Sequence, residues 1–173
     1  MEARRPNVIL VGLSGSGKTS IGRAAARQLR WPFIDFDTEI EHREHASVRQ
    51  IFEARGEAHF RALEQAFTRE IAGCSGTIMS AGGGWVTNRD SVALLRQTGR
   101  IIYLRASPEV LVARLATARV PRPLLQVTDP LGTLTSMYEA RRPFYEEADL
   151  IIETEVFDKK QLIEQVRVYA LSL

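Results

Sequence analysis

Short apolar runs alternate along the chain with longer stretches in which apolar residues recur at helical spacing. The runs fall at 7–12, 32–36, 77–81, 100–105 and 149–153. Their continuous apolar character, as in VILV and IIYL, is typical of parallel strands covered on both faces. The stretches between them predict helices at about 17–30, 38–45, 47–55, 57–73, 88–98, 107–117, 130–147 and 158–171. The alternation predicts an α/β domain with a doubly wound, five-stranded parallel sheet and helices on both faces.

Residues at the predicted helix boundaries agree with this pattern. The expected N-caps are Ser47, Asn88, Ser107 and Asp158. The helix at 57–73 carries an apolar stripe of Phe60, Leu63, Phe67 and Ile71, so it should pack on a core. The prolines at 121 and 123 exclude regular structure from much of 118–130.

Composition narrows the class of protein. The 173 residues fit one domain, 1–173, large enough to bury a core. The single cysteine, Cys74, is typical of a reducing compartment, so we expect a cytoplasmic protein. The start, MEARRPNVIL, has no apolar run of a signal peptide, and no stretch approaches membrane-spanning length. The net charge of +2 gives no argument for nucleic acid, and the three histidines lack metal-ligand spacing.

The strongest chemical signal is GLSGSGKT at 12–19, which matches G-x-x-x-x-G-K-[ST] between a predicted strand and a predicted helix. Its glycines let consecutive backbone N–H groups surround an anion, and the helix start adds partial positive charge. Lys18 should reach the β- and γ-phosphates, and the Thr19 hydroxyl can ligate Mg²⁺. We therefore expect a nucleoside triphosphate at Gly15, Ser16, Gly17, Lys18, Thr19 and Ser20.

The second predicted strand ends in IDFDTE, which contains two aspartates two residues apart. Residues two apart on a strand face the same way, so we expect Asp35 and Asp37 to project together toward the phosphate site. One can hold Mg²⁺, and the other can orient an acceptor hydroxyl and take its proton. The alternatives are an exposed turn with two solvated acids, or an acidic helix N-terminus.

Other P-loop classes fit poorly. A GTPase should carry N-K-x-D, which does not occur in the chain. The string DPLG at 129–132 matches D-x-x-G but opens a predicted helix instead of ending a strand. The chain is also short for a motor or transporter ATPase, so a small kinase is the best interpretation.

A glycine triplet and three arginines complete the candidates. Gly82, Gly83 and Gly84 follow a predicted strand, and such a run is favoured where a ligand or a helix approaches bare backbone. Arg61 has Glu64 one turn on, Arg141 stands beside Arg142, and Arg122 lies between prolines. From position alone, a solvated surface role is the better interpretation of each arginine.

Six segments taken together resemble the shikimate kinases. They are GLSGSGKT, FIDFDTEIE, IFEARGEAHFRALE, SAGGGWVT, RPLL and MYEARRPFYEEAD, in the family's order from about residue 8 to 153. The resemblance implies a three-layer P-loop kinase fold with a substrate-binding helical segment at about 36–64 and a lid at about 117–128. It also implies a monomer that uses ATP and Mg²⁺ to phosphorylate the 3-hydroxyl of shikimate.

The resemblance also implies roles for individual residues. Asp37 contacts the shikimate hydroxyls as the candidate base, and Arg61 and Arg141 grip the shikimate carboxylate. Lys18 and Arg122, the latter on the lid, act on the phosphates. Gly82, Gly83 and Gly84 line the shikimate pocket. With Asp37 as the base, Asp35 is the expected carboxylate ligand of Mg²⁺, together with Thr19 of the phosphate loop.

The chain departs from the family pattern in two places. Trp85 stands where a small residue is expected, so its ring should cap the pocket or turn outward. The lid lacks the usual threonine and lysine-rich spacing, and the adenine-stacking arginine is either Arg114 or Arg119.

Two rival functions remain. A gluconate kinase of the same fold has no reason to carry Arg61, the glycine triplet and Arg141 together. A non-catalytic sensor has no need for all of Lys18, Thr19, Asp35 and Asp37.

Overall fold

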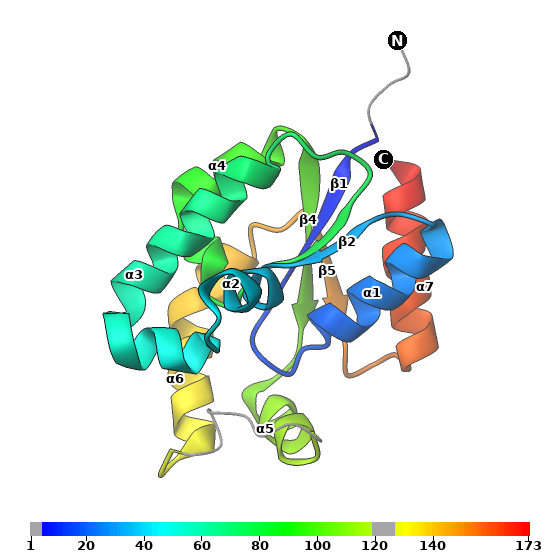
Figure 1. The fold of residues 1–173 in the computed structure, drawn as a ribbon. Helices are drawn as coiled ribbons and strands as arrows, with labels where there is room; N and C mark the ends of the chain where they lie inside the picture. The colour runs from blue at the N-terminus through cyan, green and yellow to red at the C-terminus, as the bar shows by residue number, and fades with distance from the viewer. Residues whose placement is uncertain (1–4, 119–126) are drawn as a thin grey trace.

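A computed structural model of the chain describes residues 5–118 and 127–173. In these ranges one parallel sheet contains β1 (Asn7–Val11), β2 (Phe33–Asp35), β3 (Ile78–Ser80), β4 (Gly99–Arg105) and β5 (Leu150–Glu153). Their order in the sheet is β2-β3-β1-β4-β5, with every neighbouring pair parallel (Figure 1). The predicted five-stranded parallel sheet is confirmed.

Seven α-helices and one 3₁₀ turn connect the strands in the described ranges. They are α1 (Lys18–Leu29), α2 (Phe36–Glu44), α3 (Val48–Ile71), η1 (Trp85–Thr87), α4 (Arg89–Arg96), α5 (Pro108–Ala116), α6 (Pro130–Tyr145) and α7 (Lys159–Ser172). Among the described helices, none is long and apolar enough to span a membrane.

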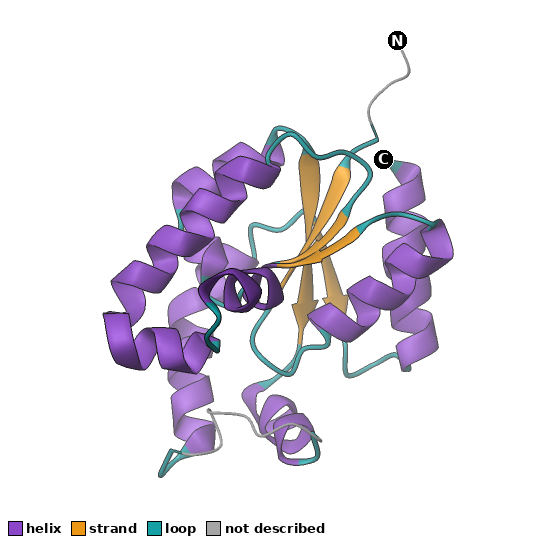
Figure 2. Ribbon diagram, in the orientation of Figure 1, coloured by secondary structure: helices purple, strands orange, loops and turns teal. Residues whose placement is uncertain are grey.

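Helices cover both faces of the sheet, as Figure 2 shows. Alternate residues of β1 point to opposite cores: Val8 and Leu10 pack with α1 and α7, whereas Ile9 and Val11 pack with α3, α4 and α6. Because all four side chains are fully buried, the run VILV is continuously apolar. The three-layer α/β architecture is therefore confirmed.

Helix α3 is the place where two predicted helices meet. It is interrupted at Gly56, whose φ of 82° and ψ of 167° are not helical, so the predicted break between 47–55 and 57–73 is confirmed. The stripe after the break buries Phe60, Phe67 and Ile71, while Leu63 is half-buried. These side chains fix α3 beside the carboxyl ends of the strands, where ligands bind in such sheets.

All four predicted N-cap residues are confirmed as N-caps, and three of them make a side-chain capping bond. Ser47 and Asp158 form capping boxes, and Asn88 accepts from the Ser91 amide. Ser107 is also the N-cap residue of its helix, but its side chain makes no capping bond.

Candidate active site

The loop between β1 and α1 is built for close backbone packing. Gly15 and Gly17 have φ of 88° and 96°, values that residues with a Cβ rarely adopt, and Gly17 is the N-cap of α1. Lys18 begins the helix and donates from Nζ to the carbonyls of Gly12 and Leu13 at 2.7 and 3.1 Å. The Ser16 hydroxyl is buried without a hydrogen-bond partner in the described structure, which leaves it available to a ligand.

Three oxygen-bearing side chains meet beside this loop. Thr19 Oγ1 donates to Asp35 Oδ2 at 2.7 Å and lies 3.5 Å from Ser80 Oγ. Hydroxyl and carboxylate oxygens are the ligands that Mg²⁺ prefers, and Mg²⁺ commonly takes only one or two of them from protein. The donor set therefore fits Mg²⁺. The sequence interpretation missed Ser80, which is here because β3 ends beside β1.

The two acids converge by a route other than the predicted one. We expected Asp35 and Asp37 on one face of a strand, but β2 ends at Asp35 and α2 begins at Phe36. Asp35 is the N-cap, with Oδ1 accepting from the Thr38 amide at 3.1 Å, and Asp37 lies in the first helical turn. The acidic helix N-terminus, one of the alternatives, is thus the local structure, and both acids still line the same cavity.

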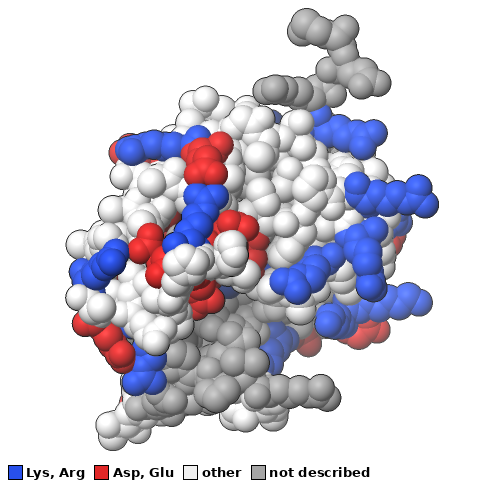
Figure 3. Space-filling model, in the orientation of Figure 1, with Lys and Arg blue, Asp and Glu red and all other residues white. Residues whose placement is uncertain are grey.

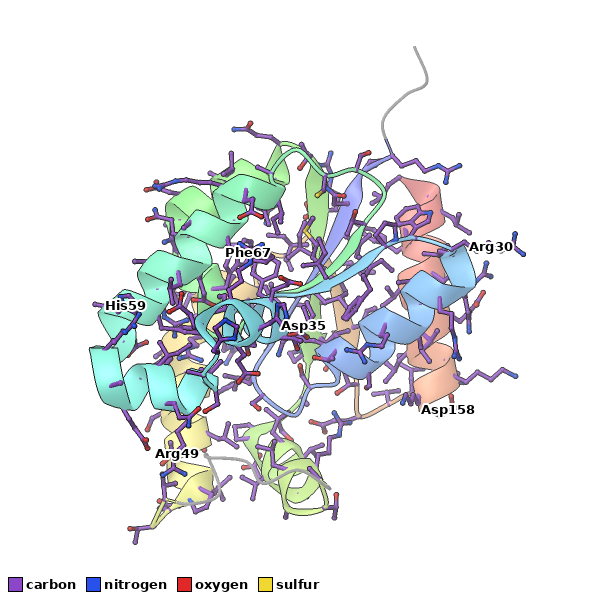
Figure 4. The ribbon with its side chains drawn as sticks, viewed as in Figure 1. Arg30, Asp35, Arg49, His59, Phe67 and Asp158 are labelled. Atoms are coloured by element: carbon purple, nitrogen blue, oxygen red, sulfur yellow. The ribbon has the colours of Figure 1, made fainter. Side chains whose placement is uncertain are left out.

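One cavity of about 1010 Å³ joins the phosphate loop to the acceptor residues. Its lining includes Lys18, Thr19 and Asp35 at one end and Asp37, Arg61, Gly82, Gly83, Gly84 and Arg141 at the other. The labelled Asp35 lies near the centre of the molecule in Figure 4. Helices α1, α2, α3 and α6 and the loop after β3 all contribute to the cavity wall.

Arg61 is held by two carboxylates of its own helix. It donates from Nη1 to Glu64 Oε2 at 2.5 Å and from Nη2 to Glu57 Oε1 at 2.9 Å. Burial lowers the pKa of Arg61, but the two carboxylates more than offset this and raise it. The guanidinium stays charged and is oriented toward the cavity by its own neighbours.

Two carboxyls at the acceptor end of the cavity have raised pKa values. Burial raises the pKa of Glu64 to about 7, although Arg61 partly opposes the shift, and the Glu64 Oε1 atom has no partner in the described structure. Burial likewise raises the pKa of Asp37, with Lys18 acting in the opposite direction. Glu64 was identified in the sequence only as a partner for Arg61; its burial comes from tertiary packing.

The glycine triplet is enclosed by the site's own side chains. A Cβ at Gly82 would collide with Glu64 and would lie 2.9 Å from Asp37 Oδ1, and one at Gly84 would collide with the Arg61 guanidinium. A Cβ at Gly83 would lie 3.4 Å from Arg141 Nη1, and the Gly83 carbonyl accepts from the Tyr145 hydroxyl. Bare backbone is therefore required for these charged groups to reach one point.

The late helix separates its two adjacent arginines. Arg141 lines the cavity, whereas Arg142 is exposed and pairs with Glu146 at 2.7 Å. The sequence-based choice of Arg141 over Arg142 for the cavity agrees with this placement.

Trp85 lies in the core, and of Arg114, Arg119 and Arg122 only Arg114 is among the described residues. Both predicted orientations of Trp85 are wrong: its ring is fully buried in the main core, and its indole N–H donates to Thr68 Oγ1 at 3.0 Å. Arg114 lines the cavity while donating to Thr154 Oγ1 and O at 2.8 and 2.9 Å. Arg119 and Arg122 lie outside the described residues, as does most of the predicted lid.

Comparisons with known proteins agree on one family. The model of the shikimate kinase family matches residues 14–169. A shikimate kinase of Cupriavidus pinatubonensis is 48% identical over 155 residues, which cover 89% of this chain and 80% of that protein. One from Pseudomonas syringae is 45% identical over 150 residues, or 86% of this chain and 87% of that protein.

Solved structures give the same result. The shikimate kinase from Acinetobacter baumannii in complex with shikimate superimposes with a TM-score of 0.88 at 35% identity, covering 96% of this chain and 93% of that one. A gluconokinase from Sinorhizobium meliloti reaches a TM-score of 0.60 at 19% identity over 98% and 94% of the two chains, and so shares the fold alone. With this P-loop kinase fold and a family match over most of its length, the chain belongs to the shikimate kinase family.

Proposed function

We propose that the chain transfers the γ-phosphoryl group of ATP to the 3-hydroxyl of shikimate, giving shikimate 3-phosphate and ADP. The observation that carries the proposal is the single cavity that joins Lys18 and Thr19 to Asp37, Arg61 and Arg141. Such an enclosure can position two substrates for in-line transfer, which is the main catalytic contribution in reactions of this type.

The loop end binds the nucleotide in this proposal. The backbone of Gly15–Thr19 surrounds the phosphates, Ser20 follows them, and Lys18 turns from its carbonyl partners to the β- and γ-phosphates. Thr19 and Asp35 would hold Mg²⁺, which when bound supplies charge neutralisation at the phosphates. We also predict that Arg122, on the lid at about 117–128, neutralises the same phosphate charge.

The helical segment at about 36–64 supplies Asp37 and Arg61 to the acceptor end. Arg61 and Arg141 bind the shikimate carboxylate, and the glycine triplet lets the ring approach the backbone. Asp37 accepts the proton of the 3-hydroxyl as that oxygen bonds to the γ-phosphorus and the bond to the ADP oxygen breaks. Burial raises the pKa of Asp37, which makes it a stronger proton acceptor than a solvated aspartate.

Substrate identity is tested by binding titrations on Arg61→Ala and Arg141→Ala. Each variant should lose about 1.5–3 kcal/mol of shikimate binding free energy, the range for hydrogen bonds to charged groups, with little change in ATP affinity. Arg142→Ala is the matched control, because this neighbour is exposed and paired with Glu146. If both variants bind shikimate normally, or lose affinity for ATP instead, shikimate is rejected as the substrate. Only the assignment as a P-loop kinase would then remain.

A coupled assay of ADP release separates the rival functions. Shikimate should stimulate release, whereas gluconate should match the sample without acceptor. Stimulation by gluconate would indicate the other kinase, and binding of shikimate without turnover would indicate a sensor. The same assay with and without Mg²⁺ tests the metal, and the monomeric state and cytoplasmic location stay predictions.

A further inference from the structure

Five exposed cations lie along one side of the molecule, from α1 to the start of α7. Arg23 and Arg27 belong to α1, Arg30 is its C-cap, and Lys159 and Lys160 form the first turn of α7. We call these five residues the basic strip. Figure 3 shows mostly blue side chains with a few red atoms on this side, whereas red and blue side chains are interspersed over α2 and α3. Figure 4 places Arg30 on the same side as Asp158, which is the N-cap residue of α7 and directly precedes the two lysines.

The strip carries little compensating negative charge. Helix α1 contains no acidic residue. Among the ion pairs of the described ranges none involves a strip residue, whereas Arg43, Arg55 and Arg89 on α2, α3 and α4 each pair with a glutamate. Its positive field therefore extends into solvent instead of ending on neighbouring carboxylates.

The two lysines stand where local helix energetics disfavour them. The N-terminus of a helix carries partial positive charge, so a cation in the first turn is unfavourable by about 0.3–1 kcal/mol. Lys159 and Lys160 occupy that turn in α7, and the turn has no acidic residue beyond the N-cap Asp158. Sequences depart from such local preferences most often at functional sites. The two lysines in this turn therefore point to a function for their charge.

The strip is continuous with the active-site cavity. Arg23 lines the cavity, and its guanidinium carbon lies 5.5 Å from the centroid of the Phe33 ring, which supports the side chain. Arg27 and Arg30 continue from it along α1, and the first turn of that helix carries Lys18. Helix α7 packs directly on α1, which places the two lysines beside this track.

We propose that the basic strip steers the nucleoside triphosphate into the phosphate loop. The inference rests on the nucleotide-binding part of the proposed function and concerns the rate of capture, not the final contacts. ATP is a polyanion, and a one-signed field that leads into a cleft raises the association rate of an oppositely charged ligand. The effect must weaken with ionic strength, since the Debye length falls from about 30 Å at 0.01 M to about 8 Å at 0.15 M.

The test measures the association and dissociation rates of N-methylanthraniloyl-ATP by stopped-flow fluorescence. Magnesium is held constant, and the salt concentration is varied from 10 to 300 mM. The variant is Arg27→Gln/Lys159→Gln/Lys160→Gln, which spares Arg23 in the cavity wall and Arg30 with its left-handed backbone. The control is Arg55→Gln/Arg69→Gln/Arg89→Gln, which removes the same charge from exposed positions on α3 and α4 across the sheet.

At low salt the strip variant should associate about 3- to 10-fold more slowly, at the low end of electrostatic steering, with its dissociation rate unchanged. Its salt dependence should be flatter than that of the wild type and of the control. An unchanged association rate, an equal loss in the control, or a change confined to dissociation would overturn the proposal. Because no acceptor is present, failure of this test leaves the kinase assignment untouched.

Discussion

The two ends of the cavity are built in opposite ways. The phosphate end comes mainly from eight consecutive residues, 12–19, in one loop and one helix turn, with Asp35 and Ser80 added from the ends of β2 and β3. The acceptor end takes Asp37 from α2, Arg61 from α3, the glycine triplet after β3 and Arg141 from α6. A local motif carries its own geometry, whereas a dispersed site depends on the sheet and the core to bring its members together.

The two ends also differ in how they hold charge. The phosphate end presents backbone N–H groups and the ammonium group of Lys18, which all favour an anion. The acceptor end holds a buried Glu64 and a half-buried Asp37 close to two arginines, and removal from water raises the pKa of both carboxyls. Mutations should therefore act through chemistry at the first end and through packing and protonation at the second.

The largest effect is expected from Lys18→Ala at the phosphate end. Loss of this point charge from the transferring phosphoryl group should lower kcat by roughly 10²-fold or more. The fold should survive, because Lys18 belongs to a loop-to-helix turn and not to the core. Steady-state kinetics with a thermal melt checks both statements. Near-normal turnover would contradict the assignment of this loop.

Gly82→Ala should break the acceptor end while sparing the phosphate end. The new Cβ collides with Glu64 and presses on Asp37, so the shikimate KM should rise roughly 10-fold or more, the size of a 1–3 kcal/mol overpacking penalty. ATP affinity should be nearly unchanged. Gly73→Ala is the control, since a Cβ there meets nothing within 4 Å. Equal effects on both ligands would mean that the two ends are not separable.

The smallest effect is expected from Glu64→Gln and concerns stability. The pKa of Glu64 is raised from 4.5 to about 7 in the folded protein, so the folded state holds this proton more tightly than the unfolded chain. Its contribution to stability is fully present below pH 4.5 and is lost as pH rises to 7. The unfolding free energy of the wild type should therefore fall relative to the variant by on the order of 1 kcal/mol between pH 5 and 8.

Urea unfolding of the ligand-free proteins at the two pH values measures this difference. Glu57→Gln is the matched control, because Glu57 bonds the same arginine but has a side chain 60% exposed. A wild-type to Glu64→Gln difference that does not change with pH would show that burial does not control the protonation of this carboxyl.

Prediction from the sequence was most successful where neighbouring residues decide the structure. Strand runs, the break at Gly56 and the phosphate loop depend on local periodicity and on glycine, and all three agree with the structure. The predicted geometry of Asp35 and Asp37 was wrong because the strand ends at Asp35, which caps α2, so Asp37 lies in a helix. Strand length here is decided by pairing with β3, which local sequence does not reveal.

Tertiary packing explains the remaining errors. Trp85 points into the core because Thr68, seventeen residues earlier, offers its indole N–H an acceptor. Ser80 joins the metal-site oxygens only because β1 and β3 are neighbours. Glu64 looked like half of a surface ion pair, and its burial requires the loop after β3 to fold over α3.

The break at Gly56 divides the local stability of the pocket wall. The second half of α3 is anchored by Phe67 and Ile71 in the main core. The first half contributes Ile51 to a separate cluster, whose other buried members are Ile40 of α2 and Phe60, four residues after the break. At about 1.5–3 kcal/mol for each such side chain, this cluster resists local unfolding far less than the sheet does. Local opening of the wall that covers the acceptor should therefore cost less free energy than unfolding of the strand that carries the phosphate loop.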